Sequence, residues 1–250
     1  MDYFHVFTWF WIGCAVVIFP ILLKVTAPYG RHTTRQWGPV MSNTWGWVVQ
    51  EAPSFLLVTF FFFTGSLPKT HASYFFWALW SLHYIHRSFI FPFRTKTQGK
   101  TIPVLIVASA IFFNLWNGIL NGYYFGSVGG NYDDSFFTSP RFFTGFAIFL
   151  TGVFINVQSD NILLSLRKPG ETGYKIPEGG FFRWVSCPNL FGEMVEWCGF
   201  AVMVWSLPAF SFALWTVVNL LPRALDHHRW YQSKFPDYPA SRKAVIPGLL

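Results

Sequence analysis

Residues 47–63 read WVVQEAPSFLLVTFFFF and set two polar side chains, Gln50 and Glu51, against a wall of aliphatic and aromatic residues. The apolar run around them extends from 44 to 66, and a helix that crosses a bilayer needs about 20 mostly apolar residues. A carboxyl group in such a helix is costly to bury, so it needs either a function or a polar partner on another helix. The stretch therefore predicts a membrane helix whose carboxyl group is either functional or a buried polar contact between spans.

The composition of the whole chain also indicates a membrane protein. Of the 250 residues, 52% are hydrophobic, 22% are aromatic and only 12% are charged, whereas a soluble domain has roughly 25% charged residues. The 31 Phe and 13 Trp need either a very large core or lipid to face. We expect an all-α polytopic membrane protein in which residues 1–250 form a single domain. The net charge of +7 then marks a cytoplasmic face rather than a nucleic-acid partner.

Apolar runs predict seven transmembrane helices. These are expected at 3–23, 44–66, 72–92, 102–122, 141–163, 190–206 and 207–222. The last two meet at Leu207-Pro208, as either a tight hairpin or one broken segment. The first lacks the basic start and cleavage site of a signal peptide, so we expect it to be retained as a span.

Basic residues orient these helices. If the N-terminus lies outside, 15 of the 18 Lys and Arg fall within the inside segments 24–43, 93–101, 164–189 and 223–250. Lys and Arg mark cytoplasmic loops. The C-terminus is therefore expected in the cytoplasm, and the basic inner face suits an anionic ligand.

Three polar stripes border the inner side, with side chains four residues apart and hence on one helix face. They consist of Asn156 and Asp160 with Arg167 two turns further on, of Asn189, Glu193 and Trp197, and of Arg223, His227 and Tyr231. Between them lies the basic loop LRKPGETGYKIPEGGFFRWVS, residues 166–186. The forked guanidinium group of Arg suits the phosphates of a nucleotide cofactor, and a carboxylate suits its ribose hydroxyls. Neither a GxGxxG after a strand nor a GxxxxGK[ST] occurs, so the nucleotide is expected to bind among helices.

The segment SLHYIHRSF, residues 81–89, holds a second polar cluster. His83 and His86 have metal-like HxxH spacing but lack further ligands at a suitable spacing, and the cysteines show no CxxC pattern, so we expect no metal site. Tyr84 is the more informative residue, because a phenol in an apolar span needs a hydrogen-bond partner. Glu51 is a candidate for that partner.

Several blocks of the chain resemble the steroid 5α-reductases (3-oxo-5α-steroid 4-dehydrogenases). They occur in the family's order and read VVQEAPSF (48–55), LHYIHRSFIFP (82–92), NGILNGYY (117–124), INVQSDNILLSLRKPGETGYKIPEGGFF (155–182), VSCPNLFGEMVEWCGFA (185–201) and RALDHHRWYQSKFPDYPASRKAVIP (223–247). The resemblance implies an enzyme that binds NADPH toward the cytoplasm and reduces the C4=C5 double bond of a 3-oxo-Δ4-steroid. Hydride would go to C5, and negative charge would develop on the C3 oxygen.

The resemblance also assigns roles to residues. Glu51 and Tyr84 match the catalytic pair that contacts the C3 carbonyl, with Gln50 beside them in the substrate site. In its neutral form Glu51 can donate a hydrogen bond to a developing oxyanion, as Tyr84 can. The cofactor residues implied are Arg87, Asn156, Asp160, Arg167, Tyr174, Asn189, Glu193, Trp197, Arg223, His227 and Tyr231.

One position and one loop depart from the family pattern. Asp226 stands where animal members often have another basic or polar residue. The loop at 93–101 does not align cleanly, so Arg94, Lys96 and Lys100 are not assigned to phosphate.

Alternative functions remain open on the sequence. They are reduction of another lipid or sterol double bond, a membrane methyltransferase that uses S-adenosylmethionine, and a transporter with intramembrane carboxylates. The transporter explains neither the RKPGE loop nor the HHRWY tail. For the reductase we expect a monomer with a steroid-like substrate, in the endoplasmic reticulum or a bacterial inner membrane. The natural substrate and the proton donor to C4 are not identified.

Overall fold

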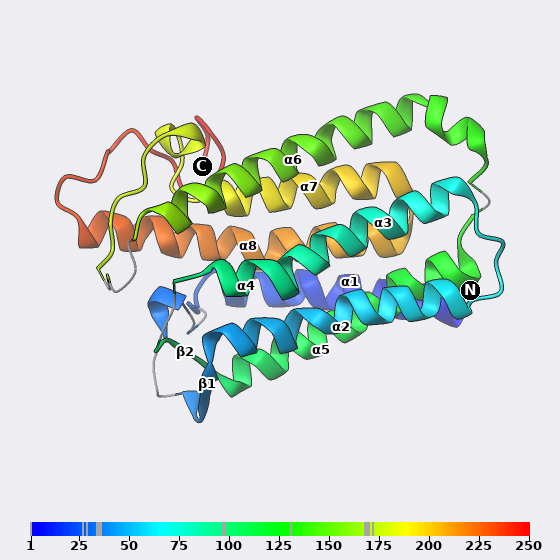
Figure 1. The fold of residues 1–250 in the computed structure, drawn as a ribbon, viewed down its shortest axis with the longest axis horizontal. Coiled ribbons are helices and arrows are strands. Elements are labelled where there is room, and N and C mark those ends of the chain that lie inside the picture. The colour runs from blue at the N-terminus through cyan, green and yellow to red at the C-terminus, as the bar shows by residue number, and fades with distance from the viewer. Residues whose placement is uncertain are drawn as a thin grey trace. The chain divides into compact units, whose positions relative to one another are not determined.

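The computed structural model describes residues 2–26, 28, 30–33, 37–96, 99–130, 132–167, 171 and 173–250. Over these residues the chain is mostly helical, as predicted (Figure 1). The α-helices are α1 (Tyr3–Leu22), α2 (Asn43–Thr64), α3 (His71–Ile85), α4 (Phe91–Arg94), α5 (Val104–Tyr123), α6 (Pro140–Ser165), α7 (Pro188–Val204) and α8 (Leu207–Lys234). Two short strands, β1 (Val40–Ser42) and β2 (Thr101–Pro103), pair antiparallel.

Two of the helices continue through π-helical turns. The turn His86–Ile90 joins α3 to α4, so the chain is helical without a break from His71 to Arg94. A second turn, Tyr124–Val128, extends α5. π-bulges are rare in proteins overall but occur often at functional sites. The first turn, which contains Arg87, is therefore a candidate functional segment.

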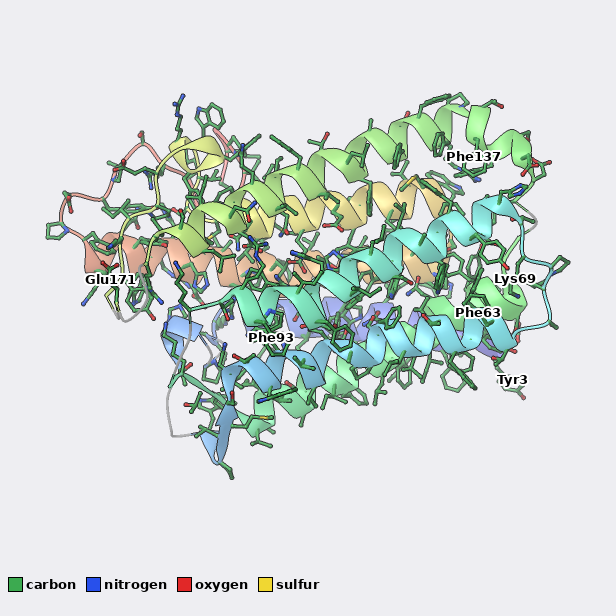
Figure 2. All side chains as sticks on the ribbon, in the orientation of Figure 1. Tyr3, Phe63, Lys69, Phe93, Phe137 and Glu171 are labelled. Atoms are coloured by element: carbon green, nitrogen blue, oxygen red, sulfur yellow. The ribbon has the colours of Figure 1, made fainter. Side chains whose placement is uncertain are left out.

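Within the described part of the chain, four helical segments are long and apolar enough to cross a membrane. They are α1, α2, Val104–Val128 and α6. The helices α3, with 15 residues, and α7, with 17, are not among these four segments. Large apolar side chains such as Phe63 and Phe93 are 52% and 58% exposed (Figure 2), as expected of rings that face lipid. Seven spans and the orientation of the termini stay predictions.

The chain divides into two compact units, residues 27–140 and residues 1–26 with 141–250. In the first unit β1 leads into α2 and β2 leads into α5 (Figure 1). The two helices run parallel and in close contact, because glycines on α5 face α2. A Cβ added at Gly118 would lie 3.0 Å from the Leu57 Cβ, and one added at Gly122 would lie 2.8 Å from the Val58 Cα.

In the second unit, α6 and α7 run antiparallel with their backbones in contact. A Cβ added at Gly145 would lie 2.9 Å from the Gly199 carbonyl oxygen, and one added at Gly152 would lie 2.6 Å from the Gly192 carbonyl oxygen. Each helix presents its two glycines seven residues apart, which is close to two helical turns. Small residues at such an interface let polar backbone and side-chain groups meet across helices.

Helix α8 packs against both α7 and α1 in the same unit. The Trp215 indole nitrogen donates to the Trp11 carbonyl oxygen at 3.0 Å. The connection from α7 to α8 consists of Trp205, in the left-handed region with φ of 52°, and Ser206. Of the two arrangements predicted there, the tight hairpin is the one found. Helix α8 also continues past residue 222 to Lys234, so the third polar stripe lies on a single helix.

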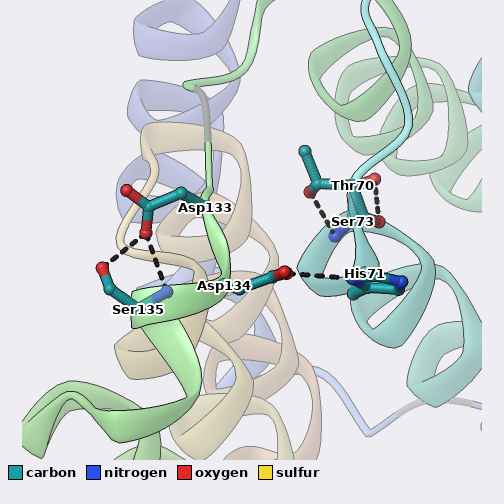
Figure 3. A network of polar contacts seen from close by, with 6 residues as sticks. All are labelled: Thr70, His71, Ser73, Asp133, Asp134 and Ser135. Carbon is teal, nitrogen blue, oxygen red and sulfur yellow. Dashed lines mark hydrogen bonds and ion pairs between the residues drawn. The ribbon is translucent and has the colours of Figure 1, made fainter.

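Side-chain caps fix one end of the first unit (Figure 3). The Ser73 N–H donates to Thr70 Oγ1 at 3.2 Å where α3 begins, and the Ser135 N–H donates to Asp133 Oδ1 at 3.0 Å. Hydrogen bonds from the Ser135 hydroxyl and N–H lower the pKa of Asp133. His71 Nδ1 lies 2.9 Å from Asp134 Oδ1, but both side chains are exposed, so this pair contributes little stability.

The glycine contacts predict the effect of a single added methyl group. With Gly192→Ala, the Cβ would lie 2.7 Å from the Gly152 carbonyl oxygen, so α6 and α7 must move apart. Such overpacking costs about 1–3 kcal/mol, and the midpoint of thermal unfolding in detergent should fall.

The matched control is Gly13→Ala in α1, where an added Cβ meets nothing within 4 Å. Its midpoint should stay or rise, because alanine is favoured over glycine in a helix by about 0.5–1 kcal/mol. Equal midpoints for the two variants would contradict the close packing of α6 on α7.

Candidate active site

Three helices of the first unit contribute to one hydrogen-bonded chain of buried polar groups. Asn114 of α5 donates from Nδ2 to the Gln50 carbonyl oxygen of α2 at 2.7 Å. The Tyr84 hydroxyl of α3 donates to Asn114 Oδ1 at 3.4 Å. Gln50 Nε2 in turn donates to Glu51 Oε1 at 3.0 Å. The structure thus links the predicted residues Gln50, Glu51 and Tyr84 through Asn114.

Burial makes this chain of contacts unusual. Gln50, Tyr84 and Asn114 are 4%, 3% and 2% exposed, and Glu51 is half-buried. Gln50 Oε1 is a buried acceptor without a hydrogen-bond partner among the described residues. A buried acceptor of this kind costs about 1–3 kcal/mol, which proteins tolerate mainly where a function requires it.

Aromatic contacts hold the ring of Tyr84. Its ring stacks on that of Trp80, with centroids 5.3 Å apart. The Trp80 indole nitrogen donates to the Ser54 carbonyl oxygen of α2 at 3.4 Å. The ring of Tyr84 is therefore held by Trp80, which is itself bonded to α2.

Arg87, predicted to bind the cofactor, lies in the π-helical turn between α3 and α4. Its guanidinium carbon is 5.0 Å from the centre of the Trp47 ring and 5.3 Å from that of Phe91. These cation–π contacts position its charge near the start of α2.

The first two predicted stripes meet where α6 and α7 are in backbone contact. Asn156 Nδ2 donates to the Asn189 carbonyl oxygen at 2.9 Å, and Asn189 Nδ2 donates to Asp160 Oδ1 at 3.1 Å. Asn156 and Asp160 are buried. The two contacts depend on Gly192, because an added Cβ there would lie 2.9 Å from the Asn156 Cα.

A second group connects the basic loop to α8. Arg167 Nε donates to the Gly173 carbonyl oxygen at 2.9 Å, and its guanidinium carbon lies 4.7 Å from the centre of the Tyr174 ring. The Tyr174 ring meets Trp230 of α8 edge-on at 4.8 Å. Lys168, also in the predicted basic loop, lies outside the described residues.

The remaining predicted residues differ in burial. Trp197 is 1% exposed and packs edge-on against Phe212 of α8 at 4.6 Å. Tyr231 is 3% exposed and stacks on Tyr238. Glu193 of α7 and Arg223 and His227 of α8 are half-buried.

Asn114, which connects α2, α3 and α5 in the first unit, was not predicted from the sequence. A signal for it exists in the sequence, because Asn114, Asn117 and Asn121 recur at three- and four-residue spacing on α5 and all are buried.

Asp226, which departs from the family pattern, forms an ion pair with Arg229 on the same helix. Among the described residues, no three His, Cys, Asp or Glu side chains are grouped so as to hold a metal ion.

Comparison with known proteins identifies the family. The family model described as 3-oxo-5-alpha-steroid 4-dehydrogenase matches residues 100–250. The chain is 42% identical over 240 residues to 3-oxo-5-alpha-steroid 4-dehydrogenase 1 of Macaca fascicularis, covering 95% of this chain and 90% of that protein. It is also 42% identical to Steroid 5-alpha-reductase DET2 of Arabidopsis thaliana, covering 91% of this chain and 89% of the relative. On the resemblance of its sequence blocks, now supported by these matches, the chain belongs to the 3-oxo-5-alpha-steroid 4-dehydrogenase family.

Proposed function

We propose that the protein reduces the C4=C5 double bond of 3-oxo-Δ4-steroids, with NADPH as the reductant, to 5α-reduced 3-oxo-steroids. Membership of the family supports the reaction class. The observation that carries the proposal is the buried chain of hydrogen bonds from Glu51 through Gln50 and Asn114 to Tyr84. It sets two possible hydrogen-bond donors for a ketone, a carboxyl and a phenol, among apolar helices.

Glu51 and Tyr84 polarise the C3 carbonyl in this proposal. As C5 receives hydride, negative charge develops on the C3 oxygen, and donors aimed at that oxygen lower the barrier. Gln50 donates to Glu51 Oε1, so a neutral Glu51 carries its proton on Oε2, the oxygen that can donate. This arrangement makes Gln50 the residue that orients the carboxyl group.

Tyr84 can exchange its partner at low cost. The 3.4 Å separation between its hydroxyl and Asn114 Oδ1 is longer than the 2.5–3.0 Å typical of an O–H···O bond. Donation to a steroid carbonyl therefore replaces a weak hydrogen bond by a stronger one, while the contact with Trp80 keeps the ring in place.

The donor set of the second unit suits a phosphorylated dinucleotide. Guanidinium groups of Arg167 and Arg223 suit phosphate, and the carboxylate of Asp160 suits ribose hydroxyls. The side-chain amide of Asn189 donates to that carboxylate, and Asn156 in turn donates to the Asn189 carbonyl oxygen. Glu193, His227 and Tyr174 complete the lining of the proposed cofactor site. The buried side chains of Trp197 and Tyr231 pack behind these residues. When bound, NADPH supplies the hydride that C5 receives.

The proposal includes the predicted setting of the enzyme. Residues 1–250 act as one seven-span domain with a cytoplasmic C-terminus, and the cofactor site faces the cytoplasm. The excess of basic residues in the predicted inside segments supports this orientation. The enzyme acts as a monomer on a steroid taken from the bilayer of the endoplasmic reticulum or a bacterial inner membrane.

Turnover by the purified protein tests the reaction. Testosterone and progesterone are incubated with NADPH, and the products are identified by mass spectrometry and by comparison with 5α and 5β standards. We expect 5α products that have gained one hydride and one proton. No turnover of any enone steroid by protein that binds NADPH would overturn the assignment and favour another lipid double bond.

Substitutions at Glu51 separate hydrogen-bond donation from charge. Glu51→Gln keeps a donor, whereas Glu51→Leu removes it, and one oxyanion donor is worth about 10²–10³ in kcat. We expect kcat to fall by roughly that factor in Glu51→Leu and by less in Glu51→Gln. Equal losses in the two variants, with NADPH affinity intact, would contradict donation by Glu51.

Arginine in the cofactor site should not be replaceable by lysine. Arg223→Lys keeps the charge but loses the forked contact to phosphate, so KM for NADPH should rise about tenfold, the equivalent of one charge-assisted hydrogen bond, with little change in KM for the steroid. The control is Arg229→Lys on the same helix, where the side chain pairs with Asp226 and is mostly exposed. A similar KM for NADPH in both variants would argue against phosphate binding by Arg223.

A further inference from the structure

One buried hydroxyl group joins three segments of the second unit. Ser186 precedes α7 and is 2% exposed. Its Oγ lies 2.6 Å from Nδ1 of His228 on α8 and 2.6 Å from the hydroxyl of Tyr238 in the tail that follows α8. The same Oγ lies 3.2 Å from the carbonyl oxygen of Lys243 further along the tail.

The backbone reinforces this junction. The Ser186 N–H donates to the Lys243 carbonyl oxygen at 2.8 Å, and the Cys187 N–H donates to the Ala244 carbonyl oxygen at 3.1 Å. In return, the Lys243 N–H donates to the Trp184 carbonyl oxygen at 2.9 Å. The tail is thus paired with the segment that leads into α7.

Proton counting assigns the direction of the three side-chain contacts. A serine hydroxyl has one proton and two lone pairs, and a carbonyl oxygen can only accept. All three contacts are satisfied together only when Ser186 donates to Lys243 and accepts from both Tyr238 and His228. His228 therefore donates from Nδ1. Burial and the nearby Lys243 charge lower the pKa of His228, so the ring is neutral at pH 7 with its proton on Nδ1.

Tyr238 connects this junction to the expected cofactor residues. Its ring stacks nearly parallel on Tyr231, with centroids 5.2 Å apart. Arg242, which is 7% exposed, places its guanidinium carbon 5.4 Å from the Tyr238 ring and donates to the Pro177 carbonyl oxygen at 3.0 Å. The Tyr238 ring therefore contacts Tyr231 of the α8 stripe directly. Through Arg242 it is also connected to the segment that follows Tyr174.

We infer that Ser186, His228 and Tyr238 form a clamp that holds the tail against α8 and so positions Tyr231 and the segment after Tyr174 for the nicotinamide cofactor. The inference rests on the proposed function, because it takes these residues as the cofactor site. The three clamp residues are positioning residues: they act through Tyr231 and Arg242. Loss of the clamp should weaken NADPH binding more than it slows the bound enzyme.

Substitutions at His228 test the hydrogen bond itself. The amide N–H of asparagine lies close to the position of Nδ1, whereas that of glutamine lies close to Nε2. His228→Asn should therefore keep the donor to Ser186, and His228→Gln should lose it although its side chain is the larger. A residue that only filled space would show the opposite order or no difference.

The experiment measures the dissociation constant of NADPH by fluorescence titration, and KM and kcat for reduction of the steroid. We expect Ser186→Ala and His228→Gln to raise the dissociation constant about tenfold, as loss of a buried hydrogen bond does, with kcat changed less. His228→Asn should stay close to the wild type. The control is Ser233→Ala, an exposed serine of α8 whose hydroxyl donates to the nearby Trp230 carbonyl oxygen, and it should have no effect.

A second readout needs no cofactor. Trypsin cleavage after Lys234 or Lys243 reports release of the tail, and Ser186→Ala and His228→Gln should be cut faster than the wild type and His228→Asn. Equal affinity for NADPH in Ser186→Ala and the wild type, or equal effects of His228→Asn and His228→Gln, would overturn the clamp. If the wild type itself failed to bind NADPH, the proposed function and the cofactor role would fall together, and the trypsin comparison would still decide whether the clamp holds the tail.

Discussion

Buried polar groups on apolar helices need hydrogen-bond partners, and in both units some of these partners lie on a neighbouring helix. In the first unit Asn114 satisfies the Gln50 carbonyl oxygen and the Tyr84 hydroxyl. In the second unit Asn189 joins Asn156 to Asp160. Asn114 does this with both atoms of its side-chain amide, whereas Asn189 donates from its side chain and accepts at its backbone carbonyl oxygen.

Close helix contact brings the partners of these bonds within reach of one another. Glycines on α5 let α2 approach, and paired glycines on α6 and α7 bring two backbones together. Larger residues at Gly122 or Gly152 would move the helices apart and stretch the hydrogen bonds between them. Packing and chemistry are therefore linked, since the same small residues that bring the helices together also set the geometry of the polar side chains.

Much of this arrangement could be predicted from the sequence, and the reason for the rest is physical. Hydropathy and four-residue spacing predicted the long helices and the stripe Arg223, His227 and Tyr231 on one helix, which the structure confirms. Periodicity does not set the rotation and depth of one helix against another, so it could not find the Asn114 or Ser186 contacts. Hydropathy placed the end of the last span at 222, and the helix itself continues to Lys234, because helical hydrogen bonding does not stop where apolar residues end.

In the proposed mechanism, Glu51 and Tyr84 polarise the C3 carbonyl of a bound steroid. Isotope-edited infrared difference spectroscopy, with testosterone labelled at the C3 carbonyl, measures that polarisation directly. We expect a carbonyl stretch at lower frequency in the wild type than in an apolar solvent, and a shift largely lost in Tyr84→Phe and Glu51→Leu but kept in Arg223→Lys. A carbonyl frequency in the wild type equal to that in both substrate-site variants would contradict it.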